Sequence, residues 1–267
     1  MMGKMGIIDI GTNTIRCVCY DITSEIELFD ELVFSSEILT YTKDGVMSFE
    51  GILWLDEIIK KAIEFFNQKE ISDIHAFATS AMRDVDNFLE VSSFVEKRVK
   101  IELLSEKEEA ECDFYALKYV LGNKLSGVGI DLGGGSMQLL AFCDGELNLS
   151  KSFPIGVKRL YNKFGKFKKE NEKSVLEYIK DIVGDVPKSK VLYVMGGTGK
   201  KIAKILGKKE FLICELDNEA LFDDKNKDRH SEINTIPYGV LVIKYMATNS
   251  IKIMDCGSRE GFVSQRL

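Results

Sequence analysis

Two short stretches of the chain repeat the same polar residues at a spacing of 122 positions. IDIGTNT at 8–14 and IDLGGGS at 130–136 each place an aspartate two residues before a glycine and end in a hydroxyl side chain. Backbone N–H groups beside glycine can approach phosphate oxygens closely, and a hydroxyl adds a donor. Aspartate would repel bare phosphate, but Mg²⁺ held by one or two carboxylates and water can bridge to it. One such stretch alone would indicate a structural glycine turn. Two in register favour a phosphate site, with Asp9 and Asp131 as Mg²⁺ ligands.

The local conformation of the second stretch follows from what surrounds it. In a dinucleotide-binding unit the glycine turn must open a helix. MQLLAF, which follows Ser136, is too apolar and too short for a clear amphipathic helix, and it soon reaches the turn pair Asp144-Gly145. We therefore predict that the glycines lie in a β-hairpin turn.

A candidate general base lies in LLSEKEEAE at 103–111. Ser105 and Glu108 have the spacing of an S-x-x-E capping box, in which Glu108 turns back to the N–H of Ser105. Glu109 lies outside that box, and the positive end of the helix dipole favours its ionised form, which suits a base for water. Without the other motifs, acidic residues that only stabilise a helix N-terminus would be the better interpretation.

Composition narrows the setting in which these residues act. The 267 residues, 45% of them hydrophobic, can bury one large core or two ordinary ones. Six cysteines lack CxxC spacing and no stretch has the apolar length of a membrane span, so we expect a cytoplasmic protein without disulfides. His75 and His230 have no partner at ligand spacing, and we interpret both as structural or surface residues.

Charge is distributed unevenly along the chain. Residues 151–209 carry 16 Lys and Arg against 5 Asp and Glu, a net charge of +11 in a chain whose net charge is −6. The cationic residues that could guide a polyanion are Lys158, Arg159, Lys163, Lys166, Lys168 and Lys169. A solvated lysine-rich helix and a site for an anionic partner explain this stretch equally well.

The expected secondary-structure elements occur twice in the same order. In the first half we predict strands at 5–9, 15–22, 25–34, 71–79 and 99–104, with helices over 51–68, 86–98 and 105–121. In the second half we predict strands at 127–132, 137–143, 146–153, 190–195 and 250–255, and helices over 158–183, 199–206 and 235–248 and from Ser258. Each half is approximately βββαβαβα, as in duplicated domains. We place the domains at 1–122 and 123–267, with a terminal helix (258–267) that can fold back on the first domain.

Taken together, these motifs resemble the exopolyphosphatase/guanosine pentaphosphate phosphohydrolase (Ppx/GppA) family, within the superfamily of actin, sugar kinases and Hsp70-type ATPases. The resemblance covers nearly the whole chain and rests on DIGTNTIR (9–16), ATSAMRDVDN (78–87), LLSEKEEAE (103–111), GIDLGGGSMQL (129–139), SFPIGVKRL (152–160), MGGTGKKIAKI (195–205) and SREGFV (258–263). It implies an α/β fold of two ribonuclease-H-like, actin-like ATPase domains with an interdomain cleft. It also implies Mg²⁺ dependence and hydrolysis of phosphoanhydride bonds by a carboxylate-activated water.

The same resemblance assigns roles to individual residues. Glu109 would be the base, because the family's glutamate precedes a small residue, here Ala110. Substrate phosphates would contact two loops and an arginine at the cleft, namely Gly11, Thr12, Asn13, Thr14, Arg83, Gly133, Gly134, Gly135 and Ser136. Gly196, Gly197 and Thr198 resemble a third loop, which faces the nucleoside in the ATPase relatives. The chain departs from the family at Met137-Gln138, where Thr-Glu is common. This departure removes one expected acidic Mg²⁺ contact, although Gln138 matches a glutamine that orients the water in nucleoside triphosphate diphosphohydrolases.

These implications predict an exopolyphosphatase that acts on polyphosphate or on a phosphorylated guanine nucleotide such as guanosine pentaphosphate. We expect neither DNA nor a membrane as partner, and a homodimer stays open. A non-catalytic nucleotide or alarmone sensor with the same fold and a nucleoside triphosphate phosphohydrolase are the alternatives, because a fold does not guarantee its chemistry. A sugar or acetate kinase is disfavoured, since nothing obvious in the sequence supplies an acceptor site.

Overall fold

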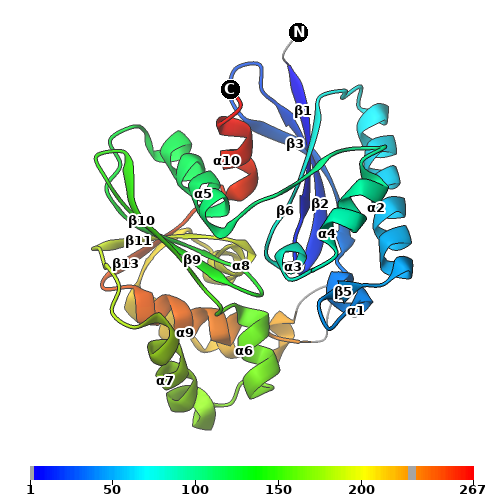
Figure 1. Cartoon of the computed structure of the whole chain (residues 1–267). Coiled ribbons are helices and arrows are strands. Elements are labelled where there is room, and N and C mark those ends of the chain that lie inside the picture. Colours follow the sequence, from blue (N-terminus) through cyan, green and yellow to red (C-terminus); the bar gives the residue numbers. More distant parts are fainter. Residues whose placement is uncertain (1–2, 228–232) are drawn as a thin grey trace. The chain divides into compact units, whose positions relative to one another are not determined.

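The structure, a computed structural model, describes residues 3–227 and 233–267, so that His230 lies outside the described residues. The chain divides into two units, which we call unit 1 (residues 1–109) and unit 2 (residues 110–267). Each unit consists of one main β-sheet with helices packed against it (Figure 1). The predicted α/β class is confirmed.

The sheet of unit 1 has the strand order β3-β2-β1-β6-β7. Its strands are β1 (Lys4–Ile10), β2 (Thr14–Asp21), β3 (Glu27–Ser35), β6 (Ile74–Ala78) and β7 (Ile101–Leu103). β1 lies near the centre, antiparallel to β2 and parallel to β6. Its run MGII is buried on both faces, which is typical of a strand covered on both sides.

Helices α2 (Phe49–Gln68) and α4 (Phe88–Val95) pack against this sheet. α2 begins at Ser48, whose side chain accepts the N–H of Gly51, and it buries an apolar face that includes Ile52, Leu55 and Ile59. The smaller elements of unit 1 were not predicted from the sequence. They are α1 (Ile38–Tyr41), the hairpin of β4 (Thr42–Lys43) and β5 (Val46–Met47), and α3 (Ser80–Arg83). These pieces are too short to show a periodic pattern.

Unit 2 repeats the topology of unit 1, with the strand order β10-β9-β8-β11-β13-β12. The strands are β8 (Gly127–Leu132), β9 (Met137–Cys143), β10 (Glu146–Phe153), β11 (Val191–Met195), β12 (Glu210–Leu212) and β13 (Ser250–Ile253). β12 is an addition at the edge and runs antiparallel to β13. The other five strands follow the connectivity of unit 1, which confirms the predicted duplication.

The helices of unit 2 differ at one place from those predicted from the sequence. They are α6 (Val157–Phe164), α7 (Glu172–Val183), α8 (Gly197–Leu206), α9 (Ile236–Met246) and α10 (Ser258–Ser264), with the 3₁₀ helices η1 (Lys169–Asn171), η2 (Ile213–Asp217), η3 (Glu219–Phe222) and η4 (Asp224–Asn226). The single helical stretch predicted over 158–183 is wrong, because α6 ends at Gly165. Gly165 has φ +72°, a conformation that glycine adopts easily and that stops a helix.

Helix α5 (Glu106–Leu121) links the two units through the chain itself. It begins in unit 1 and runs into unit 2, and the predicted domain boundary after residue 122 falls just past its last residue. α10 packs against the part of α5 that belongs to unit 2, whereas its folding back on the first domain stays a prediction. None of the described helices is both long and apolar enough to cross a lipid bilayer.

Candidate active site

The first predicted phosphate loop, Gly11–Thr14, is the tight turn between β1 and β2. The N–H of Gly11 donates to the carbonyl of Thr14 at 3.1 Å, and Ile10 pairs with Ile15 at the base of the turn. The hydroxyls of Thr12 and Ser80 lie 3.4 Å apart, which joins the loop to α3. Within the described part of the chain, the N–H groups of Thr12 and Asn13 donate to no other group, so they can serve an anion.

The second loop, Gly133–Ser136, is the turn between β8 and β9 and closes with the same bond. The N–H of Gly133 donates to the carbonyl of Ser136 at 3.0 Å, which confirms the predicted hairpin turn. Its carbonyl groups face the start of α6. Gly133 O accepts the N–H of Val157 at 3.1 Å, and Gly134 O accepts the N–H groups of Lys158 at 2.9 Å and of Arg159 at 3.1 Å.

This orientation of the carbonyls determines where the loop's N–H groups point. The guanidinium Nε of Arg159 donates to the carbonyl of Gly135 at 3.0 Å, so three successive carbonyls are held on the α6 side. In a trans peptide the N–H is opposite to the C=O, and the N–H groups of Gly134, Gly135 and Ser136 therefore point away from α6. They donate to no group among the described residues. Successive N–H groups with one orientation form an anion-binding concavity.

Gly156, the residue before α6, makes the close contact between the Gly133–Ser136 loop and the start of α6 possible. A Cβ atom at Gly156 would lie 2.3 Å from both the carbonyl carbon and the oxygen of Gly134, where no side chain fits. Gly156 and Arg159 both lie in the motif SFPIGVKRL, and Arg159 belongs to the basic residues of the cationic stretch, but the contact of these two residues with the loop was not predicted from the sequence. A glycine directly before a helix was the signal that could have indicated a close approach.

The third loop lies beside the second within unit 2. Asp131 is the penultimate residue of β8 and pairs with Met195 of β11. A Cβ atom at Gly196 would lie 2.5 Å from Oδ1 of Asp131. The Asp131 carboxylate is therefore at the start of α8. Gly197 is exposed, whereas Thr198 is buried and its methyl group packs where a Cβ of Gly239 in α9 would be. Substrate contacts of Gly197 and Thr198 stay predictions.

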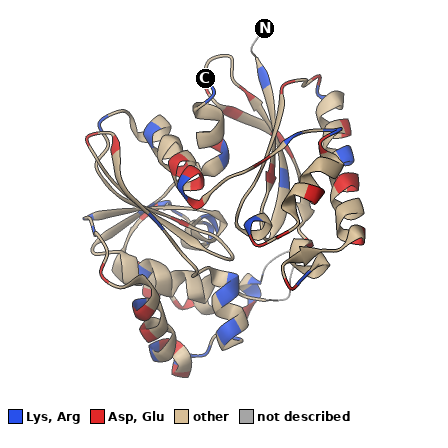
Figure 2. Ribbon diagram, viewed as in Figure 1, with Lys and Arg blue, Asp and Glu red and all other residues tan. Residues whose placement is uncertain are grey.

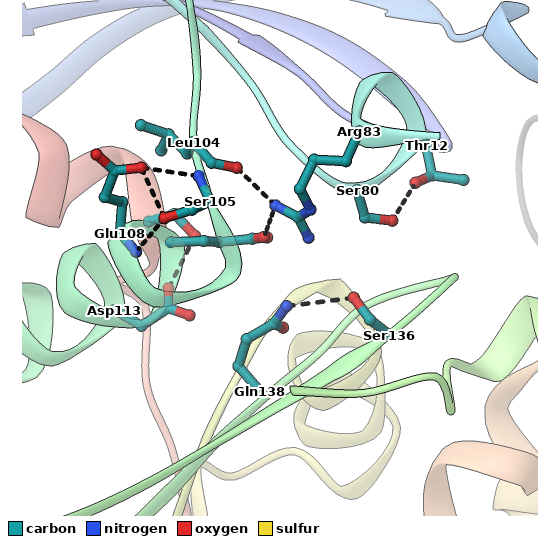
Figure 3. Close-up of polar contacts among 11 residues, drawn as sticks. Thr12, Ser80, Arg83, Leu104, Ser105, Glu108, Asp113, Ser136 and Gln138 are labelled. Atoms are coloured by element: carbon teal, nitrogen blue, oxygen red, sulfur yellow. Dashed lines mark hydrogen bonds and ion pairs between the residues drawn. The ribbon is translucent and has the colours of Figure 1, made fainter. Parts of the chain in front are cut away.

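The predicted capping box at the start of α5 is confirmed (Figure 3). The N–H of Ser105 donates to Oε2 of Glu108 at 2.8 Å, and the hydroxyl of Ser105 accepts the N–H of Glu108 at 3.2 Å. The Ser105 hydroxyl also donates to Oε2 of Glu108, and these hydrogen bonds hold the pKa of Glu108 below its usual value. The carboxylate of Glu108 is thus occupied in stabilising the helix terminus.

Glu109 lies one residue further and has a different environment. Its side chain is buried, and Oε2 accepts a hydrogen bond from Nη1 of Arg83 at 2.8 Å. The same Nη1 donates to the carbonyl of Leu104 at 2.8 Å. Nε and Nη2 of Arg83 donate to no described group, which leaves one edge of the guanidinium for a phosphate. The structure therefore brings the predicted base and the predicted phosphate-binding arginine together within unit 1.

Asp9 and Asp131 occupy equivalent positions in the two sheets, and Gln138 has the position in unit 2 that Arg16 has in unit 1. Asp9 lies opposite Arg16 in the β1–β2 pair, and Asp131 lies opposite Gln138 in the β8–β9 pair. Gln138 is buried, and its Nε2 donates to the hydroxyl of Ser136 at 3.2 Å. In unit 1 the side chain of Arg16 instead makes an ion pair with Glu31 at 2.8 Å.

Comparison with known proteins decides the family. The sequence profile of the Ppx/GppA phosphatase family matches residues 40–234. The chain belongs to the Ppx/GppA phosphatase family. Exopolyphosphatase 1 from Mycobacterium tuberculosis and from Mycobacterium bovis is 28% identical to this Ppx/GppA chain over 172 residues, 59% of the chain and 47% of each relative. The chain thus spans about half the length of the curated relatives it matches.

Solved structures of the family show the fold. A Ppx/GppA family member from Aquifex aeolicus superimposes with a TM-score of 0.82 at 20% identity and covers 99% of this chain and 97% of that one. An exopolyphosphatase from Cytophaga hutchinsonii gives a TM-score of 0.80 at 17% identity, with 98% and 97% covered. The predicted two-domain, actin-like fold is therefore confirmed.

In this Ppx/GppA chain, lysines of the cationic stretch (residues 151–209) already contact acidic or aromatic side chains. Lys166 makes an ion pair with Asp224, and Lys169 makes one with Glu172. Lys163 lies over the ring of Tyr178, 4.6 Å from its centre. Figure 2, which colours the ribbon by residue type, shows acidic and basic positions next to one another along α7. The described residues include no group of three or more His, Cys, Asp or Glu side chains placed to hold a metal ion.

Proposed function

We propose that this chain hydrolyses the terminal phosphoanhydride bond of inorganic polyphosphate, and that it acts on guanosine pentaphosphate in the same way. The observation that carries the proposal is the buried Glu109 carboxylate, held 2.8 Å from Arg83 while its neighbour Glu108 is occupied by the capping box. Membership of the Ppx/GppA family and the likeness to exopolyphosphatases support the substrate class.

In the proposed reaction Glu109 takes a proton from a water molecule whose oxygen attacks the terminal phosphorus. The bond from that phosphorus to the bridging oxygen breaks, and the shortened chain leaves with the electron pair. The products are inorganic phosphate and a chain one unit shorter. Arg83 would bind the terminal phosphate through Nε and Nη2 while its Nη1 holds Glu109, so one guanidinium would orient both base and substrate. Gln138 would help to orient the water.

The loops would stabilise the negative charge of the phosphates. The N–H groups of Gly134, Gly135 and Ser136 have one orientation already, because α6 holds the carbonyls. Donors fixed in advance need no reorganisation when charge develops on the transferred phosphoryl group. The N–H groups of Thr12 and Asn13 would act in the same way in unit 1, with the hydroxyl of Thr14 as a further donor.

The residues at the strand ends fit a magnesium ion. Asp9 and Asp131 offer carboxylate oxygens, the ligand type that Mg²⁺ prefers, and Asp131 reaches the start of α8 across a position where only glycine fits. When bound, Mg²⁺ would neutralise phosphate charge. Asp9 and Asp131 are the residues that would hold it.

The test is release of phosphate from polyphosphate by the purified chain in the presence of Mg²⁺. Glu109→Gln should lower kcat by on the order of 10²- to 10⁴-fold with little change in KM, since only proton acceptance is removed. Glu108→Gln is the matched control and should keep its activity, because Glu108 serves the helix terminus. An inactive Glu108→Gln beside an active Glu109→Gln would reverse the assignment.

A second candidate is a sensor that binds a phosphorylated nucleotide without hydrolysing it. Two hydrogen bonds favour it, since Glu109 is already held by Arg83 and the amide of Gln138 by Ser136. A sensor would bind guanosine pentaphosphate in calorimetry and release no phosphate from it or from polyphosphate. Release that depends on Glu109 rejects the sensor.

A further inference from the structure

We propose that helix α10 positions the general base, and that Ser258 and Gly261 act through α5 on Glu109. The inference rests on the proposed function for the role of Glu109, but its structural part can be measured separately. We use the term α5–α10 contact for the contacts of Cys112 and Asp113 with Ser258, Gly261 and Gln265.

The centre of the α5–α10 contact is an approach of backbone to backbone. A Cβ atom at Gly261 would lie 1.6 Å from the carbonyl oxygen of Cys112 and 2.4 Å from its carbonyl carbon. Any side chain at this position would force the two helices apart, because neither neighbouring atom belongs to a flexible side chain. Gly261 therefore sets the distance between α10 and α5.

Two polar contacts lie on either side of this approach. The hydroxyl of Ser258 donates to Oδ1 of Asp113 at 2.8 Å (Figure 3), and the thiol of Cys112 donates to Oε1 of Gln265 at 4.0 Å. Asp113 is fully buried, and a hydrogen bond to a buried carboxylate is among the stronger ones in proteins. The start and the end of α10 are both fixed on the same turn of α5.

The turn of α5 that contains Cys112 and Asp113 follows the turn that contains Glu109. Asp113 is four residues after Glu109, so the two side chains lie on the same side of α5. The N–H of Glu109 donates to the carbonyl of Ser105 at 2.9 Å, and the capping box fixes the helix before it. Glu109 therefore sits between two fixed points of one rigid helix. A shift of α5 at Cys112 would be transmitted to the carboxylate, and an error of about 1 Å at a reacting group can cost on the order of 10²-fold in rate.

The fold of α10 does not depend on these contacts alone. Phe262 and Val263 are fully buried and stabilise the helix by their apolar area. Ser258 and Gly261 can therefore be changed in a chain that still folds, which makes the positioning role measurable.

The decisive variant is Gly261→Ala, which we expect to lower kcat by on the order of 10- to 100-fold and to change KM by less than about twofold. The matched control is Gly51→Ala in α2, where a Cβ would lie 2.5 Å from the Cβ of Tyr41. This control inserts a comparable wedge into unit 1 without touching α5, and its kcat per folded molecule should equal that of the wild type. An equal loss of kcat in both variants would reduce α10 to a stability element and overturn the proposal.

The route through Glu109 is tested by combining variants. In a Glu109→Gln background, Gly261→Ala should lower the residual kcat by less than about twofold, since a group that is absent cannot be misplaced. Ser258→Ala should lower kcat by about tenfold, and Ser258→Thr, which keeps the hydroxyl donor for Asp113, should restore it. Additive effects of Gly261→Ala and Glu109→Gln would contradict the proposal.

Hydrogen exchange separates this inference from the proposed function. The amides of residues 109 and 110 should exchange on the order of tenfold faster in Gly261→Ala, and no faster in Gly51→Ala. If Glu109→Gln kept full activity, the proposed function would fail, while faster exchange would still support the helix contact. Unchanged exchange in Gly261→Ala would overturn the inference whatever the activity.

Discussion

The two glycine loops close with the same hydrogen bond but are supported to different extents. In unit 2 the segment after β10 gives the loop three backbone hydrogen bonds and the guanidinium of Arg159. In unit 1 the segment after β3 gives one backbone bond, from the N–H of Ser36 to the carbonyl of Asn13 at 3.0 Å. The loop of unit 2 and the start of α6 therefore form one piece of structure, whereas the loop of unit 1 keeps more freedom to adapt.

From this difference we expect the two loops to have different roles. A loop whose N–H groups are fixed in advance suits a site where charge develops during the reaction. A less supported loop can close around a substrate and contribute to binding. We expect substitutions beside the loop of unit 2 to affect kcat most, and equivalent changes in unit 1 to affect mainly KM.

Among substitutions that test the comparison of the two loops, the largest effect is expected from Gly156→Ala. The added Cβ cannot fit 2.3 Å from Gly134, so the loop or α6 must move. We expect a loss of on the order of 10²-fold in kcat/KM, carried mainly by kcat, with a stability cost of about 1–3 kcal/mol. The measurement is steady-state phosphate release together with thermal unfolding.

Gly11→Ala in unit 1 provides the comparison. A Cβ there would lie 3.1 Å from the carbonyl oxygen of Thr14, a contact that a small movement relieves. Its effect should be at least about tenfold smaller than that of Gly156→Ala and should appear in KM. Equal losses in both variants would show that the two loops are equally constrained.

Local patterns in the sequence explain which parts of the site were predictable. The strands β8, β9 and β10, the hairpin turn at Gly133 and the capping box of Ser105 and Glu108 all depend on residues close in sequence, and all were predicted. The bond from Arg83 to Glu109 spans 26 residues, and that from Ser258 to Asp113 spans 145. Such contacts depend on how strands and helices are ordered in space, which the periodicity of a single sequence does not encode.

The same limit applies to elements that lack a period. The one-turn helices α1 and α3 are shorter than the window in which an apolar repeat can be recognised. The break between α6 and α7 depends on Gly165 at φ +72°, and an isolated glycine in a helical pattern indicates a stop only weakly. Arg83, identified through a family resemblance, could be placed next to Glu109 only with the structure in hand.

A smaller effect is expected at the start of α5. Here the side chains of Ser105 and Glu108 cap a helix terminus, and no glycine loop is involved. The hydrogen bonds of Ser105 lower the pKa of Glu108, so their stabilisation is complete above the unfolded-state pKa, near 4.3, and is lost as the pH falls through the folded-state value. Glu108→Gln should therefore cost about 0.5–1 kcal/mol at pH 7 and almost nothing at a pH well below 4. Urea unfolding at the two pH values measures this. A cost that is the same at both would contradict the role of the ionised carboxylate.

The smallest effect concerns the charge of the two segments that support the glycine loops, the one after β10 in unit 2 and the one after β3 in unit 1. Residues 154–169 hold six Lys and Arg and no Asp or Glu, whereas residues 36–47 hold Lys43 with Glu37 and Asp44. A polyphosphate chain would be attracted to the segment in unit 2. However, Lys166 and Lys169 already have the acidic partners Asp224 and Glu172, so a substrate would exchange one ion pair for another. Exposed pairs of this kind contribute little in water, and attraction beyond about 8 Å is screened at physiological ionic strength.

We therefore expect neutralisation of Lys166, Lys168 and Lys169 to raise KM for long polyphosphate by about two- to threefold at low salt, and by less at high salt. KM for guanosine pentaphosphate should change less, because a short substrate reaches fewer lysines. The measurement is KM for short polyphosphate, long polyphosphate and guanosine pentaphosphate at two salt concentrations. The control neutralises Lys60, Lys61 and Lys97 of unit 1, which lie outside the segments compared, and should leave all three KM values unchanged. If both triple variants respond alike, the lysines of unit 2 are a solvated surface, and the two segments differ in how they hold their loops but not in how they attract substrate.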